Sequence, residues 1–132
     1  MLKEEYRDNK FEDCFDVLYK RYTQVRRLRR DGNCFYRAFL FQVFEHFIFN
    51  KDSKQYDTFI QAIDKSKKEL MELGYDEIVI EDFHDLFLTE TKNLKSIDPS
   101  KAHEHLMKVL CNREEANYLI MHARFMTACH LK

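Results

Sequence analysis

The architecture of this 132-residue chain depends on the segment Asp31-Gly32-Asn33-Cys34-Phe35-Tyr36-Arg37-Ala38-Phe39. Turn-forming residues end at Asn33, and a strongly apolar segment, long enough for about four turns of helix, then runs from Cys34 to Phe49. The sequence therefore predicts that Cys34 opens a helix. Because unpaired N–H groups and the helix dipole favour negative charge at a helix N-terminus, a thiol there is biased toward the nucleophilic thiolate.

The loop before Cys34 is suited to the chemistry of such a nucleophile. Gly32 can supply a positive φ or a close backbone approach, and the N–H groups of Gly32, Asn33 and Cys34 can converge on a developing oxyanion. This oxyanion loop would serve acyl transfer. The alternative for a cysteine taken by itself is a small buried apolar residue under an ordinary turn.

The same nine residues resemble the active-site cysteine motif of the ovarian tumour (OTU) family of cysteine deubiquitinases, and their Phe-Tyr-Arg-Ala portion is most similar to its otubain branch. Weaker similarity continues at Glu81-Asp82-Phe83-His84 and Asn117-Tyr118-Leu119-Ile120. The resemblance runs from Asp13 to Leu131, which leaves residues 1–12 as an N-terminal extension. It indicates a partial otubain-like OTU domain over residues 1–132, because only the N-terminal part of the family's domain is covered.

Composition fits one globular domain without a membrane segment. The chain is 45% hydrophobic, enough for a core, and a formal net charge of −1 with charges of mixed sign argues against a dedicated nucleic-acid binder. The N-terminus lacks the apolar core of a signal peptide, and no segment is long enough to cross a bilayer. We therefore expect a cytoplasmic protein, with the nucleus as an additional location. The cysteines lack paired spacing and are expected to be free thiols: Cys14, Cys34, Cys111 and Cys129.

Apolar periodicity predicts helices along most of the chain. Residues 11–22 are expected to form a short amphipathic helix beside the Cys34 helix, which has almost no polar face and should be buried on all sides. A long amphipathic helix should end at Gly74. A short β-like piece, Ile78-Val79-Ile80, is then expected before a helix that starts at Glu81 and Asp82.

Two more helices are expected, one after the start signal Asp98-Pro99 and a last one from Glu114 to His130. The sequence as it stands thus predicts a mainly α chain. The resemblance implies the helical lobe of a papain-like α+β cysteine peptidase fold that lacks most of its sheet. Because the last helix is apolar beyond one stripe, another layer is expected to cover it.

Four arginines precede the motif and suggest a nucleic-acid interpretation. Because they do not form part of an extended basic stripe, they are more typical of a solvent-exposed segment leading to the motif or of a contact with a partner. They are Arg26, Arg27, Arg29 and Arg30.

A cysteine hydrolase needs a base within hydrogen-bond reach of its thiol, usually a histidine. The family's catalytic histidine lies late in the domain and is followed by an aromatic residue and then a carboxylate or amide. No histidine in this sequence is followed by such a pair of residues. His46 would lie about 18 Å from Cys34 along its helix, and His84 is expected to be structural. The general base is therefore expected to be absent, although six histidines lie in predicted helices: His46, His84, His103, His105, His122 and His130.

The resemblance implies that Cys34 is the nucleophile and that Asp31 belongs to the active site. The residues alone favour Asp31 as a loop brace that accepts backbone N–H bonds. We expect no cofactor. No metal site is expected either, because His103 and His105 should point to different sides of a helix, and His122 with Cys129 or His130 lacks further ligands.

The resemblance implies a ubiquitin thioesterase, a cysteine-type enzyme that hydrolyses the isopeptide bond between the C-terminal glycine of ubiquitin and a lysine. Without a general base, this chain alone is expected to be inactive. The expected partners are ubiquitin or polyubiquitin and a ubiquitin-conjugating enzyme, with no nucleic acid and no membrane. The alternatives are a non-catalytic module that binds ubiquitin or a conjugating enzyme, and an incomplete gene product.

Overall fold

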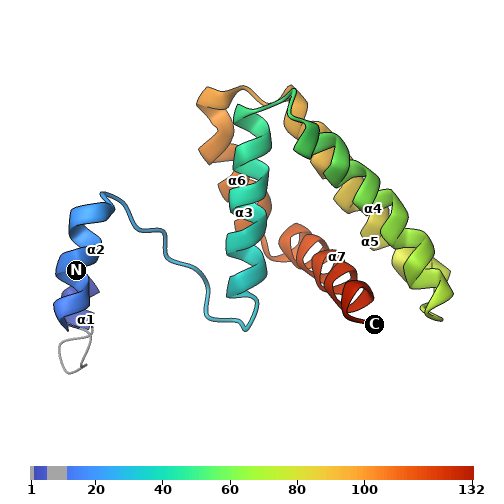
Figure 1. Cartoon of the computed structure of the whole chain (residues 1–132), viewed down its shortest axis with the longest axis horizontal. Coiled ribbons are helices and arrows are strands. Elements are labelled where there is room, and N and C mark those ends of the chain that lie inside the picture. The colour runs from blue at the N-terminus through green and yellow to red at the C-terminus, as the bar shows by residue number, and fades with distance from the viewer. Residues whose placement is uncertain (1, 6–11) are drawn as a thin grey trace.

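The computed structural model describes residues 2–5 and 12–132, and every regular element in these two ranges is a helix (Figure 1). The mainly α prediction is confirmed. No helix in the described ranges has the length and apolar character needed to cross a membrane. The elements are α1 (Leu2–Glu5), α2 (Glu12–Arg21), α3 (Cys34–Phe49), α4 (Lys54–Glu72), α5 (Glu77–Asn93), η1 (Leu94–Ser96), η2 (Pro99–Lys101), α6 (Ala102–Cys111) and α7 (Arg113–Leu131).

Side-chain caps determine where several helices begin. An oxygen of each capping residue accepts a backbone N–H in the first turn, which would otherwise lack a partner inside the helix. Gly74 has a φ of +88° and follows the last turn of α4, as predicted. The capping residues are Ser53, Asp76, Asp98 and Asn112.

The predicted β-like piece at Ile78-Val79-Ile80 is wrong, because these residues form the first turns of α5. The predicted start at Glu81 and Asp82 is also wrong, since Asp76 accepts the N–H of Ile78 at 2.9 Å and the helix begins at Glu77. β-Branched residues lower helix propensity only slightly. The cap and the complete burial of Ile80 outweigh that preference, although Ile78 is 74% exposed.

Helix α3 packs against α6 and α7 in the α3–α7 bundle, and α7 packs against α3, α4, α5 and α6 (Figure 1). Leu40, Phe44 and Ile48 recur at helical spacing on its core face and are fully buried. The prediction of burial on all sides is wrong, because Phe35 is 69% exposed and Phe39 is also exposed. Periodicity reports how apolar a helix is, whereas the neighbouring elements decide which faces are covered.

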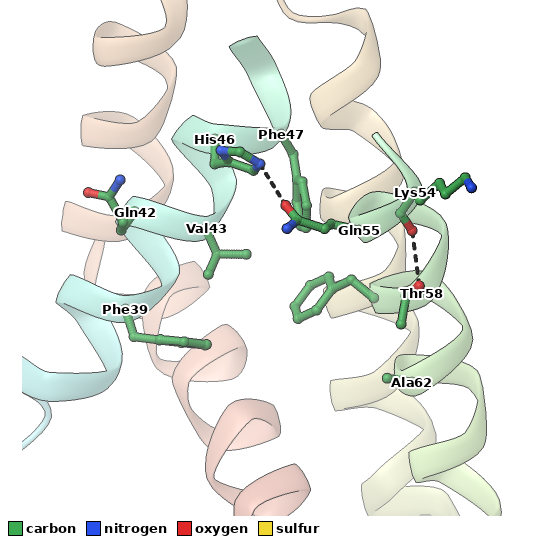
Figure 2. A pocket seen from close by; sticks show the side chains of 10 residues that line it. Phe39, Gln42, Val43, His46, Phe47, Lys54, Gln55, Thr58 and Ala62 are labelled. Carbon is green, nitrogen blue, oxygen red and sulfur yellow. Dashed lines mark hydrogen bonds between the residues drawn. The ribbon is translucent and has the colours of Figure 1, made fainter. Parts of the chain in front are cut away.

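An open apolar groove of about 600 Å³ lies between α3 and α4 (Figure 2). Phe39 and Val43 line its α3 side, and Ala62 lines the opposite side. Near one end, His46 Nε2 lies 3.0 Å from Gln55 Oε1, so a polar bridge joins the two helices there. The face of α3 that was expected to be buried therefore contributes to an accessible groove.

Helix α2 does not pack beside α3, contrary to the prediction. Figure 1 shows α1 and α2 together at one side of the molecule, joined to α3 by the extended segment 22–33. Val17 and Tyr19 are consequently exposed. The segment itself is held against the bundle, because the Arg26 guanidinium stacks 3.5 Å from the centre of the Phe41 ring.

Two histidines meet in the interior between α5 and α7. His122 is fully buried, and neither of its ring nitrogens has a hydrogen-bond partner in the described ranges. Its ring centre lies 5.7 Å from that of His84, which in turn has Asp85 Oδ1 at 3.0 Å and Asp64 Oδ1 at 3.8 Å. Burial, and secondly the charge of His84, lowers the pKa of His122 from 6.5 to about 4. This setting agrees with the structural role predicted for His84.

The free energy of unfolding should fall as the pH decreases from about 6.5 to about 4. The unfolded chain protonates His122 near pH 6.5, whereas the folded chain keeps this side chain neutral until about pH 4. The stability that depends on neutral His122 is therefore complete above pH 6.5 and is lost as the pH falls toward 4. The size of the pKa change corresponds to roughly 3 kcal/mol. Urea unfolding across this pH range measures the effect.

The control compares two variants of α7. His122→Phe should flatten the profile between pH 6.5 and 4, whereas replacement of the exposed His130 by Gln should leave it unchanged. An identical loss of stability in wild type and His122→Phe would show that His122 is not the responsible group.

Candidate active site

Cys34 is the first residue of α3, as predicted, and its side chain is exposed. Gly32 has a φ of +77°, a conformation that glycine adopts without a Cβ penalty, so the chain can turn sharply two residues before the thiol. The Asn33 carbonyl accepts the N–H of Arg37 at 3.0 Å, which closes the first turn of the helix. The thiol thus stands at the exposed N-terminal end of α3.

A buried arginine organises the loop before the thiol. Arg37, at the end of the first turn of α3, donates from Nη2 to Asp31 Oδ2 and from Nη1 to the Leu110 carbonyl near the end of α6, each at 2.5 Å. Only 4% of Arg37 is exposed, and its Nε has no hydrogen-bond partner among the described residues. A buried charge is very costly without a counter-charge, so Asp31 and Arg37 keep each other in place.

Asp31 also braces the loop through the backbone. Its Oδ1 accepts the N–H of Asn33 at 3.0 Å, which matches the brace favoured by the residues alone. This hydrogen bond, and then the Arg37 guanidinium, lowers the pKa of the Asp31 carboxyl below its usual value. Because the Asn33 N–H is engaged in this way, only the N–H groups of Gly32 and Cys34 in this loop lack a hydrogen-bond partner within the described ranges.

The side chain of Asn33 connects the loop to the C-terminal helix. Its Oδ1 accepts a hydrogen bond of 3.1 Å from Arg124 Nη1 of α7, across 91 residues of sequence. The oxyanion loop is therefore tied to α6 through Arg37 and Leu110 and to α7 through Arg124.

The arginine-rich approach has its own intramolecular partners. Arg26 Nη2 lies 3.3 Å from His103 Nδ1, and Arg29 donates to the Cys111 carbonyl at 3.4 Å. Arg27 forms a 2.7 Å ion pair with Glu5. Arg26 and Arg29 thus hold the segment 22–33 against α6, and Arg27 connects it to α1.

None of the six histidines forms a hydrogen bond with Cys34 in the described part of the chain. His103 faces Arg26, whereas His105 Nε2 lies 2.7 Å from Glu90 Oε1, so the prediction that they point to different sides is confirmed. Within residues 2–5 and 12–132, no group of three metal-ligating side chains comes together.

Sequence reasoning missed the two arginines that fix the loop. Arg37 carries a usable signal, because a charged side chain on the core face of an apolar helix indicates a buried partner. Arg124 carries no such signal, since its partner Asn33 lies 91 residues away and only the tertiary fold brings them together.

The four cysteines are free thiols, as predicted, but their surroundings differ. Cys34 and Cys111 are exposed, whereas Cys129 is half-buried in α7 and its Sγ lies 3.6 Å from Glu69 Oε2. Burial, and then the interaction with Glu69, raises the pKa of Cys129. Cys129 therefore has the surroundings of an unreactive thiol.

Comparisons with known proteins give a consistent result. A family model described as Peptidase C65 Otubain matches residues 1–132. An ovarian tumour domain-containing deubiquitinating enzyme of Arabidopsis thaliana is 34% identical over 113 residues, which cover 85% of this chain and 37% of that protein. The ubiquitin thioesterase OTUB1 of Homo sapiens is 32% identical over 125 residues, or 95% of this chain and 44% of that protein. The chain thus spans less than half the length of these relatives.

We expect Cys34 to react fastest with iodoacetamide near neutral pH and Cys129 to react slowest. The reason is that Cys34 is exposed at a helix N-terminus, whereas the pKa of Cys129 is raised by burial. Mass-mapped alkylation kinetics compare all four thiols in one molecule, with Cys111 as the exposed reference. Equal rates at Cys34 and Cys111 would contradict an activating effect of the helix start.

Proposed function

This chain belongs to the otubain family of cysteine peptidases, and from that membership we propose that it carries the nucleophile-bearing part of a ubiquitin thioesterase domain. The observation that carries the proposal is the exposed Cys34 thiol at the start of α3, behind the loop held by Asp31. Residues 1–132 then form a partial otubain domain, the helical lobe of a papain-like fold. The relatives' printed names, deubiquitinating enzyme and ubiquitin thioesterase, support ubiquitin conjugates as the substrate class.

In this proposal the Cys34 thiolate attacks the carbonyl carbon of ubiquitin's C-terminal glycine. The N–H groups of Gly32 and Cys34 bind the oxyanion of the tetrahedral intermediate. Its collapse breaks the bond to the lysine nitrogen, which leaves as an amine after receiving a proton, and water then hydrolyses the thioester. Asp31 supports the site by fixing the Asn33 backbone rather than by contacting the substrate.

We further propose that residues 1–132 by themselves do not turn over substrate. The leaving amine needs a proton donor and the thiol needs a base, and no histidine forms a hydrogen bond with Cys34 in the described ranges. Loss of the triad histidine costs roughly a millionfold in a serine protease. The same observation favours a second candidate function, a non-catalytic module that binds ubiquitin or a ubiquitin-conjugating enzyme.

An electrophilic ubiquitin probe, with a reactive group at its C-terminus, should label Cys34 slowly while di-ubiquitin remains uncleaved. Labelling needs only ubiquitin docking and a thiolate, whereas turnover also needs a general acid and base. Intact-mass spectrometry reports the adduct, and gel electrophoresis reports the cleavage.

Two matched cysteine variants control this experiment. Cys34→Ala should abolish labelling, and replacement of the exposed Cys111 by Ala should not affect it. Persistent labelling of Cys34→Ala would overturn the nucleophile assignment. Ubiquitin binding without any labelling would favour the binding module, and rapid cleavage of di-ubiquitin would show that the chain does contain a base.

A further inference from the structure

Helix α3 differs from four other helical elements in the use of its N-cap residue. Asparagine is among the strongest N-cap residues, yet the side chain of Asn33 makes no capping hydrogen bond and binds Arg124 instead. The backbone of Asn33, with φ −108° and ψ 11°, also departs from the extended conformation of the other capping residues. The four side chains that do cap their own helices belong to Ser53, Asp76, Asp98 and Asn112.

The diverted side chain leaves the start of α3 with unused donors. The N–H groups of Cys34, Phe35 and Tyr36 have no hydrogen-bond partner in the described ranges, whereas a capping oxygen would occupy one of them. These donors adjoin the Cys34 thiol. Unpaired N–H groups and the helix dipole both favour negative charge at this position.

We propose that Arg124 is a positioning residue for Cys34, which acts by holding the Asn33 side chain away from the first turn of α3. The donors of that turn then stay available to the Cys34 thiolate and to the oxyanion that follows it. The proposal deepens the proposed function and rests on Cys34 as its nucleophile. It makes the C-terminal helix α7 part of the machinery that prepares the nucleophile.

Arg124→Gln tests the proposal, because the shorter neutral side chain releases Asn33. The Asn33 backbone can then move to the extended conformation of the other capping residues, in which its side chain caps α3. Alkylation of Cys34 by iodoacetamide should become about two- to fivefold slower, the factor expected from one helix-terminus interaction at an exposed site. The urea midpoint should stay the same or increase, since a cap is gained. A purely structural role for Arg124 would instead lower the midpoint and leave the alkylation rate of the folded protein unchanged.

Rescue by a second substitution makes the test specific. Adding Asn33→Ala to Arg124→Gln removes the competing oxygen and should restore the wild-type alkylation rate. Arg124→Lys keeps a donor for Asn33 and should also react at the wild-type rate. Arg113→Gln is the matched control, because Arg113 is exposed at the start of the same helix and has no side-chain partner in the described ranges.

Amide hydrogen exchange is a second measurement of whether the Asn33 side chain moves from Arg124 to the first turn of α3. The N–H groups of Phe35 and Tyr36 should be protected more strongly in Arg124→Gln than in wild type, and the Asn33→Ala double variant should remove that protection. A wild-type alkylation rate in Arg124→Gln would overturn the proposal, as would a double variant that stays slow. Because iodoacetamide requires no ubiquitin, these results are independent of the ubiquitin-probe experiment.

Discussion

The ion pair between the buried Arg37 and the more exposed Asp31 is the interaction on which the arrangement of the candidate site depends. The Arg37 guanidinium lies inside the bundle and has two anchors, the Asp31 carboxylate and the Leu110 carbonyl. Losing either anchor would leave a strongly polar group buried without its partner. The loop before Cys34 and the end of α6 are therefore placed relative to each other by one side chain of α3.

Most of the fold follows from apolar periodicity and from caps, whereas the site depends on tertiary contacts. The apolar segment from Cys34 to Phe49 predicted α3, and Gly74 marked the end of α4 correctly. The start of α5 was predicted wrongly because three consecutive β-branched residues, Ile78, Val79 and Ile80, favour a strand. This local preference is weak compared with the Asp76 cap and the burial of Ile80. Asn33 and Arg124 meet only after the helices pack, so no local pattern could identify their contact.

Placement of Cys34, the proposed nucleophile, is therefore a property of the whole bundle rather than of the motif alone. The motif supplies Cys34 and Asp31, α3 supplies the buried counter-charge, and α7 supplies the partner of Asn33. This organisation explains how an exposed loop can keep a defined geometry, since Arg37 anchors it to the buried interior and Arg124 anchors it to α7. The six histidines take no part in it, and two of them instead meet in the interior of the bundle.

A double-mutant cycle on Asp31 and Arg37, measured by urea unfolding, tests this account most directly. Asp31→Ala alone should lower the unfolding midpoint, because the buried guanidinium loses its counter-charge. Adding Arg37→Met removes that buried charge, so the double variant should be no less stable than Asp31→Ala. Losses that simply add in the double variant would show that the two side chains act independently, and would contradict the ion pair as the interaction that holds the loop.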